Sequence, residues 1–273
     1  MNHISRRLRW RAGVVIASMG VAVSGLVVSA SGPAIAGTTP PPLDHFLCYH
    51  STEIGLKAPP NVLLKNIIQP VPFAPNIGAA SVHCNPANKS VPVALFPAKN
   101  PMAHLLCFNL SYAWKPTLMT LKNQFGNAIM KTTGGPTSLC LPTWKDVLGP
   151  PNMTPKQPPN LDHFTCYPLV PYTSSTYKFI APVPTKVEDE FSAPNYIAEK
   201  IGTANLLCVP TTKIVAGVAY SPMTASDYSL VCFPGVPTPI WKQVYDQNQF
   251  GTGRIFPTTT KEALCLPSTA IVG

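Results

Sequence analysis

Hydrophobic and polar residues alternate over short segments of this chain, which is the pattern of β-strands. In the segment HFLCY, Phe46 and Cys48 fall on one face of an extended strand. His45, Leu47 and Tyr49 fall on the other face. Further strands are predicted where β-branched and aromatic residues gather, at 91–96, 214–220, 228–233 and 241–245. The chain also contains 33 prolines, which interrupt almost every window that is long enough for a helix, so the pattern predicts an all-β fold.

The same landmarks occur twice along the chain. LDHFLCY at 43–49 returns as LDHFTCY at 161–167, and NQFG at 123–126 returns at 248–251. Each copy divides into two quarters of about 45 residues, and a fixed repeat of this size is more informative about architecture than local propensity. A quarter opens with a cysteine followed by an aromatic residue and closes with a cysteine two residues before a proline. The opening cysteines are Cys48, Cys107, Cys166 and Cys232, and the closing cysteines are Cys84, Cys140, Cys208 and Cys265.

A polar and aromatic landmark lies midway through each quarter. It is NQFG in the second and fourth quarters, where Gly126 and Gly251 are expected to supply a positive φ at a turn. Asp189-Glu190-Phe191 is its variant in the third quarter, and 65–68 (KNII) is a degenerate version in the first. We therefore interpret the chain as a tandem duplication. The predicted fold is two tandem disulfide-stabilised β domains, sandwich or barrel-like, each built of two quarter-repeats.

Proline-rich segments mark the predicted boundaries of these domains. Residues 37–42 lead into the first copy, and residues 148–160 separate the two copies and contain five prolines. Such segments favour the extended polyproline conformation and act as stiff spacers. We predict a first repeat domain at 43–147 and a second at 161–273.

The first 36 residues have the pattern of a signal peptide. Four arginines precede an apolar run at 12–30, and residues 34–36 (AIA) offer small side chains for cleavage. A retained membrane anchor is the alternative for an apolar run of this length, and twin-arginine export is an alternative to the general secretory route. We predict a secreted or extracytoplasmic protein that has no membrane span once the signal is removed.

The charge of the chain bears on its partners. Loss of the four arginines at the N-terminus lowers the formal charge from +9 to +5. Arg254 is the only arginine that remains, and the lysines are spread along the chain rather than clustered. This distribution argues against a nucleic-acid partner. The predicted partner is an unidentified ligand of the cell envelope or the extracellular space.

Eight cysteines in an exported chain predict disulfides, and eight cysteines allow 105 pairings. Pairing within each quarter preserves the repeated unit. The predicted pairs are Cys48 with Cys84, Cys107 with Cys140, Cys166 with Cys208, and Cys232 with Cys265. Pairing across quarters, for example Cys84 with Cys107, is the main alternative. Zinc is disfavoured because no two cysteines have the close spacing of a structural zinc site.

Three repeated histidines are the candidates for a functional site. His45, His104 and His163 each lie three residues before an opening cysteine, and Asp44 and Asp162 precede two of them. An aspartate and a histidine can act as orienter and base, and gathered histidines can bind a metal. The fourth quarter, however, has serine at the histidine position, and adjacent residues of a strand point to opposite faces. We therefore expect a role in the fold and assign no catalytic, cofactor or metal residue.

Motifs of known chemistry are lacking in the sequence. It has no nucleophile elbow and no glycine-rich phosphate loop. Its one acidic cluster, 188–190 (EDE), does not have the ligand spacing of a calcium loop, so we expect it in a solvated strand or turn.

The combination of DHFxCY, NQFG and LCxP followed by lysine resembles a family of exported prokaryotic proteins of unknown function. The likeness covers nearly the whole chain after the signal, and it is clearest at 44–49, 162–167, 123–126, 248–251 and the four closing cysteines. The resemblance implies export and duplication, and it brings no activity or cofactor.

The sequence thus predicts a secreted structural or binding module, more consistent with a non-enzyme than with an enzyme. The alternatives are a metal-dependent or hydrolytic extracellular enzyme that uses the repeated histidines, and a carbohydrate-binding module.

Overall fold

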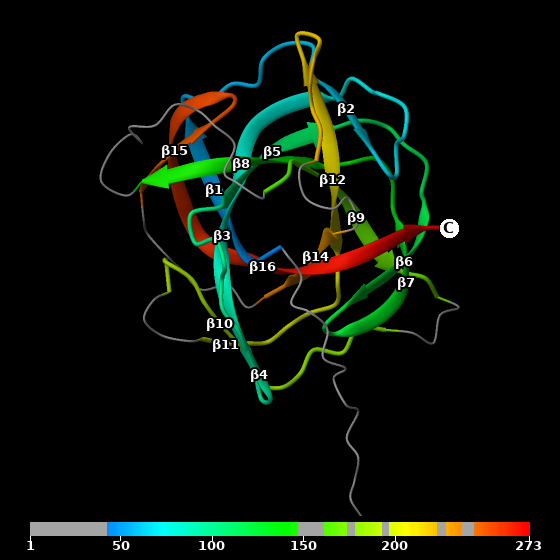
Figure 1. Ribbon diagram of the computed structural model, residues 1–273, viewed down its shortest axis with the longest axis vertical. Helices are drawn as coiled ribbons and strands as arrows, with labels where there is room; N and C mark the ends of the chain where they lie inside the picture. Colours follow the sequence, from blue (N-terminus) through cyan, green and yellow to red (C-terminus); the bar gives the residue numbers. More distant parts are fainter. Residues whose placement is uncertain (1–42, 147–160, 174–177, 193–196, 223–227, 236–242) are drawn as a thin grey trace, which may run out of the picture. The chain divides into compact units, whose positions relative to one another are not determined.

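The computed structural model describes residues 43–146, 161–173, 178–192, 197–222, 228–235 and 243–273 (Figure 1). The strands are β1 (His45–Ile54), β2 (Leu63–Asn66), β3 (Asn76–Val91), β4 (Ala94–Phe96), β5 (His104–Ser111), β6 (Leu118–Asn123), β7 (Gly126–Thr132), β8 (Ser138–Asp146), β9 (Phe164–Pro171), β10 (Thr185–Glu188), β11 (Ile197–Glu199), β12 (Leu206–Val215), β13 (Val218–Tyr220), β14 (Tyr228–Pro234), β15 (Val244–Asn248) and β16 (Gly251–Val272). No helix occurs among the described residues, which confirms the all-β prediction. In this part of the chain there is accordingly no helix able to span a membrane. The predicted signal peptide, proline-rich lead and linker lie outside the described residues.

Eight of the strands form a closed ring of antiparallel pairs. The order around the ring is β1, β3, β5, β8, β9, β12, β14, β16 and back to β1. These are the eight strands that carry the opening and closing cysteines. A closed ring leaves none of its members as an unpaired edge. We call this set of strands the eight-strand ring.

The two copies of the repeat share this ring, so the structure does not show the two separate domains that the sequence predicted. Copy one supplies β1 to β8 and copy two supplies β9 to β16, and the copies meet where β8 pairs with β9 and where β16 pairs with β1. Residues 39–273 accordingly form one compact unit. The physical reason is that one copy contributes only four strands to the ring, so its outer strands find their partners in the other copy. The predicted linker at 148–160 lies outside the described residues, and the described strands on either side of it, β8 and β9, pair with each other.

The cysteines line the inside of the ring. A small cavity touches all eight of them, one from each strand. The disulfides are Cys48–Cys84, Cys107–Cys140, Cys166–Cys208 and Cys232–Cys265, which are the four pairs of the quarter scheme. Each disulfide joins two residues that are directly opposite in neighbouring strands. Four disulfides are typical of proteins from an oxidising compartment.

The alternation predicted for the first strand holds. Phe46 and Cys48 pack in the cluster inside the ring, whereas Leu47 and Tyr49 pack in a second buried cluster on its outer face. The strands from the middle of each quarter, β2, β6, β10 and β15, cover that outer face and supply residues such as Leu121 to the outer cluster. Around the disulfides, the side chains on both faces of the ring strands are therefore buried.

The midway landmark forms the same turn in all four quarters. The side-chain oxygen of its first residue accepts a hydrogen bond from the backbone N–H two positions later, at 2.8 to 3.0 Å. The four acceptor residues are Asn66, Asn123, Asp189 and Asn248. Gly126 and Gly251 have φ values of +117° and +122°, which confirms the positive φ predicted there. The shared turn places Asn66-Ile67-Ile68 at the position of Asn-Gln-Phe.

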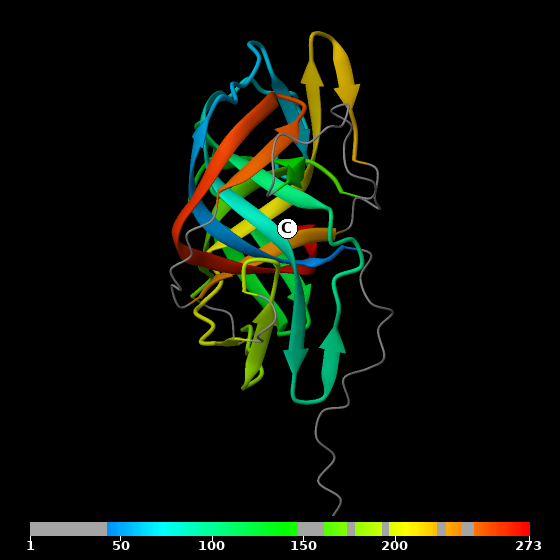
Figure 2. The same ribbon diagram turned by 90° about the vertical axis from the view of Figure 1, so that its left-hand side faces the viewer.

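Two hairpins extend from the ring at opposite ends (Figure 2). One is formed by β3 and β4, and the other by β12 and β13. They occupy equivalent positions in the two copies, directly after the closing cysteine of the first and third quarters. The aromatic residues on their return strands, Phe96 and Tyr220, lie over the polar groups described next.

Candidate functional site

The three repeated histidines do not meet in one site. Their side chains are all buried, and each ring contacts a different residue. The Nε2 atoms of His45 and His163 lie 3.1 Å from the Oε1 atoms of Gln124 and Gln249 respectively. The Nδ1 atom of His104 lies 3.1 Å from Oδ1 of Asn85. The structure therefore distributes the predicted candidates over three separate polar sets.

Buried lysines are the members of these sets that were not predicted from the sequence as site candidates. Lys89, Lys145 and Lys213 are buried, and each lies five residues after a closing cysteine. The fourth quarter has Ala270 at this position, just as it has Ser229 at the histidine position. The constant spacing from the closing cysteine was the sequence signal that could have identified these lysines. Their burial is notable because fully buried lysine is rare in proteins.

The first and third quarters contain the same three-residue set. Lys89 Nζ donates a hydrogen bond to the Gln124 oxygen that also faces His45, and Lys213 Nζ donates to Gln249 Oε1 in the same way. We call each combination of histidine, glutamine and lysine a His–Gln–Lys set. The glutamine comes from the next quarter in each case, so a set ties neighbouring quarters together.

Aromatic rings enclose both lysines. Lys89 Nζ lies 4.5 Å from the centre of the Phe96 ring and 5.2 Å from that of Phe125. Lys213 Nζ lies 4.8 Å from the centre of the Phe250 ring and 5.3 Å from that of Tyr220. Burial lowers the pKa of each lysine from 10.5 to about 7.

The histidines of these sets are held in the neutral form. Burial, together with the neighbouring lysine in each set, lowers the pKa of His45 and His163 from 6.5 to about 3. Asp44 does not orient His45, as a catalytic pair would require. Its two carboxylate oxygens instead accept hydrogen bonds of 2.8 Å from the backbone N–H groups of Lys99 and Asn100.

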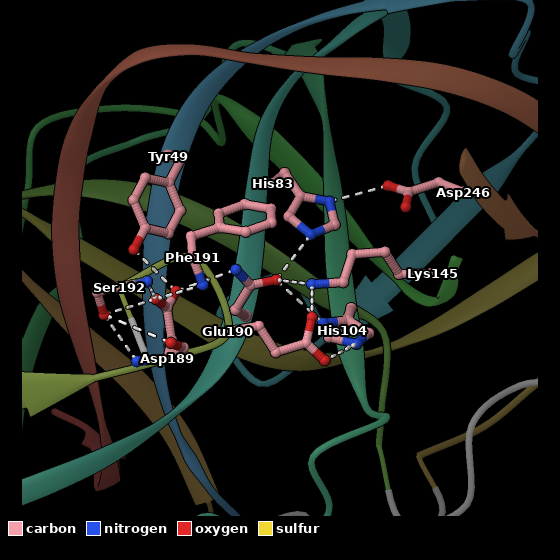
Figure 3. A network of polar contacts seen from close by, with 10 residues as sticks. Tyr49, His83, His104, Lys145, Asp189, Glu190, Phe191, Ser192 and Asp246 are labelled. Atoms are coloured by element: carbon pink, nitrogen blue, oxygen red, sulfur yellow. Dashed lines mark hydrogen bonds and ion pairs between the residues drawn. The ribbon is translucent and has the colours of Figure 1, made fainter. Parts of the chain in front are cut away.

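A larger polar network surrounds the third lysine, Lys145 (Figure 3). Its Nζ donates a hydrogen bond of 2.8 Å to Asn85 Oδ1 and forms an ion pair with Glu190. Glu190 corresponds to the glutamine of the other two sets and belongs to the variant landmark Asp189-Glu190-Phe191. Its carboxylate is 43% exposed, so this ion pair opens to solvent on one side. Burial lowers the pKa of Lys145, and Glu190 opposes that shift.

The acidic cluster 188–190 lies at the end of β10 and in the turn that follows, as predicted, but one of its residues is not solvated. Asp189 is buried, and its Oδ2 accepts hydrogen bonds from Tyr49 Oη at 2.8 Å and Asn85 Nδ2 at 3.0 Å. Its Oδ1 caps the turn through Ser192 (Figure 3). Glu190 is exposed as predicted, whereas Asp189 is buried because it occupies the turn-capping position of the repeated landmark.

His83 and Asp246 form the one arrangement in the network that resembles catalytic machinery. His83 Nδ1 lies 2.8 Å from Asp246 Oδ2, which is the geometry of a base and its orienting carboxylate. The other ring nitrogen, however, lies 2.9 Å from Asn85 Oδ1, and both side chains are fully buried. A substrate group therefore has no access to this histidine. The arrangement fits a buried polar network that specifies packing between β3, β8 and β15.

Metal binding by the cysteines is excluded by their oxidation. The sulfur atoms of Cys140, Cys166 and Cys208 lie within 4.8 Å of one another, as metal ligands can. All three belong to disulfides, however, and a disulfide has no thiolate to bind an ion.

A cleft of about 530 Å³ lies on a different part of the described surface. It is bounded by β7, the end of β9 and the segments 178–181 and 201–204, and its wall is largely apolar. The apolar lining residues include Ala128, Met130, Phe179, Ala181, Ile201 and Phe233. Lys178 and Tyr172 also line the cleft, and both side chains are exposed. This volume and composition are those of a pocket for a small ligand.

Comparison of the chain with family models, with curated proteins and with solved structures gave no match. The resemblance to exported proteins of unknown function therefore stays a prediction from the sequence.

Proposed function

We propose that this chain is a secreted binding module and that its ligand occupies the cleft beside β7. The observation that carries the proposal is the combination in that cleft of an apolar wall with the exposed cation of Lys178. Secretion is supported by the signal-like first 36 residues and by four disulfides, which persist in oxidising compartments.

The repeated polar residues support binding rather than catalysis. The histidines and lysines of the two His–Gln–Lys sets, and Lys145, are buried and make hydrogen bonds within the protein. Their conformation is fixed by the ring, so they act as packing elements of a rigid scaffold. The ligand class that fits the cleft is a small molecule or side chain with an apolar body and an anionic end, because Phe179 and Met130 offer apolar contacts and Lys178 offers a positive charge.

Anilinonaphthalene sulfonate, a fluorescent aromatic anion, is a suitable probe for this chemistry. The native protein is expected to bind it saturably, with an increase in fluorescence. Lys178→Glu is expected to weaken binding about tenfold, which corresponds to about 1.4 kcal/mol. Phe179→Ala should weaken binding as well, because it removes part of the apolar wall.

Lys122→Glu is the matched control, since Lys122 is an exposed lysine on β6 and does not line the cleft. It should leave the affinity unchanged. Equal weakening by Lys178→Glu and Lys122→Glu, or no saturable binding by the native protein, would overturn the proposal. Turnover of ester, peptide or glycoside substrates by the purified protein would favour an enzyme instead.

A further inference from the structure

Lys89 and Lys213 are buried without a carboxylate partner. They are 1% and 0% exposed, and no ion pair to either lysine is found among the described residues. Burial of an unpaired ammonium group costs several kcal/mol. The same costly feature occurs in both copies of the repeat, at equivalent positions, so it requires a physical explanation.

The partner of each lysine is a side-chain amide that can react with an amine. Lys89 Nζ contacts the carboxamide of Gln124, and Lys213 Nζ contacts the carboxamide of Gln249. In both sets a histidine ring nitrogen lies 3.1 Å from the same amide oxygen. Three groups that an acyl transfer requires therefore converge: an amine, a carbonyl carbon and a donor toward the carbonyl oxygen.

We propose that Lys89 becomes joined to Gln124, and Lys213 to Gln249, by intramolecular isopeptide bonds. In each reaction the lone pair of lysine Nζ attacks Cδ of the glutamine and forms a new C–N bond. The tetrahedral intermediate then loses the original amide nitrogen, which takes up a proton from the lysine nitrogen and leaves as ammonia. The products are one secondary amide and one molecule of ammonia, so the reaction needs no oxidant, reductant or other co-reactant.

The environment of each set favours this reaction. Because burial brings the lysine pKa to about 7, a substantial fraction of the amine is neutral and nucleophilic near neutral pH. The histidine remains neutral, with a pKa of about 3, so its Nε2–H can donate to the carbonyl oxygen as negative charge develops there. Aromatic rings lie beside each lysine nitrogen, and the glutamines are only partly buried, which gives ammonia a route out.

The product removes the cost of burial. A secondary amide carries no charge, so the penalty for a buried amine disappears when the bond forms. Each cross-link would connect a ring strand with the turn of a covering hairpin, since Gln124 lies between β6 and β7 and Gln249 lies between β15 and β16. The two cross-links would thus fix the covering layer to the ring, in addition to the disulfides inside it.

Lys145 is an internal control for this proposal. Its partner Glu190 is a carboxylate that is 43% exposed. A carboxylate has no amide nitrogen that could leave as ammonia, so the reaction proposed for the other two sets is not open to this pair. This pair should therefore remain non-covalent.

The test is the mass of the intact, correctly folded protein after full reduction and denaturation. It should be lighter than the sequence mass by two molecules of ammonia, and protease digestion should release branched peptides that join Lys89 to Gln124 and Lys213 to Gln249. Lys89→Met and Lys213→Met should each reduce the mass loss by one molecule of ammonia, because each removes one reacting amine. His45→Ala should slow bond formation between Lys89 and Gln124 relative to that between Lys213 and Gln249 in the same molecule. Protein that is recovered unfolded and kept unfolded should have the full mass.

A reduced mass equal to the sequence mass would overturn the proposal, as would linear peptides that contain Lys89 and Gln124 unmodified. Ammonia loss located at other residues would overturn it as well. The mass of the wild-type protein alone shows whether the two isopeptide bonds form, so the test does not depend on whether a variant folds. The result is also independent of ligand binding in the cleft.

Discussion

The sulfur atoms of Cys48 and Cys265 lie 3.7 Å apart, although they belong to different disulfides and are 217 positions apart in the sequence. Cys140 and Cys166 make the equivalent contact at 3.6 Å. Both contacts occur where strands of the two copies pair, β1 with β16 and β8 with β9. The disulfides of the two copies therefore pack against each other inside one ring.

Loss of one disulfide should destabilise the whole ring. The Cys232→Ala, Cys265→Ala double variant opens a loop of 33 positions, which corresponds to about 3.5 to 4 kcal/mol of unfolding free energy in the chain-entropy model. Urea denaturation measures this loss. The Cys107→Ala, Cys140→Ala variant opens a loop of equal length and should give a similar value. A loss below about 1 kcal/mol in both variants would contradict the structural role assigned to the disulfides.

The turn at Gly126 should not tolerate a side chain. Its φ of +117° is strained for other residues, although a Cβ there would meet no atom closer than 3.5 Å. Gly126→Ala should therefore lower the unfolding free energy by about 1 to 3 kcal/mol through backbone strain alone. Gly78→Ala is the control, because Gly78 has equal space and no positive φ. Equal stability of the two variants would argue against the turn geometry.

Lys145 should stabilise the polar network in which it lies. Lys145→Met removes the ion pair with Glu190 and the buried hydrogen bond to Asn85 Oδ1, and we expect a loss of about 2 kcal/mol in unfolding free energy. Lys122→Met changes an exposed lysine in the same way and should remain within about 0.5 kcal/mol of the wild type. Chemical denaturation of both variants decides the matter. If Lys145→Met is as stable as the Lys122 variant, the network contributes nothing to folding.

The buried histidines should make the fold sensitive to acid. The folded protein keeps His45 and His163 neutral down to about pH 3, whereas the unfolded chain protonates them near pH 6.5. Between these values the unfolded state binds more protons, so the unfolding free energy falls as the pH is lowered from 6.5. A His45→Gln, His163→Gln variant retains an N–H donor for the glutamine oxygens and should show a flatter pH dependence.

His50→Gln is the control for this comparison, because His50 is exposed. It should keep the pH dependence of the wild type between pH 6.5 and pH 4. Unfolding curves collected over this range test the prediction. Parallel curves for the wild type and the double variant would show that the two histidines are not held neutral in the folded protein.

Local pattern was enough to predict the faces of the strands and the disulfide pairs. Phe46 and Leu47 are correctly assigned to opposite faces, because the side-chain period of a strand depends only on neighbouring residues. The cysteine pairs follow from repeat logic, because opening and closing strands of one quarter are neighbours in the ring. The all-β class follows from the same short-range signals.

The order of strands around the ring could not be predicted in this way. Whether β8 pairs with β9 of the other copy depends on long-range closure, about which the alternation within β8 contains no information. The same limit applies to the polar sets. His45 and Lys89 carry constant spacings from their cysteines, but their shared partner Gln124 comes from another quarter. The ion pair of Glu190 with Lys145 could not be predicted for the same reason, because Lys145 lies in the preceding quarter.

Cleavage between the two copies tests the central claim that they build one ring. A specific protease site placed in the segment 148–160 allows the chain to be cut where no disulfide connects the halves, because each copy contains two of the disulfides and none joins the copies. We predict that the cut halves elute together in native size-exclusion chromatography and separate under denaturing, non-reducing conditions. Two folded halves that elute separately in native buffer would contradict the shared ring.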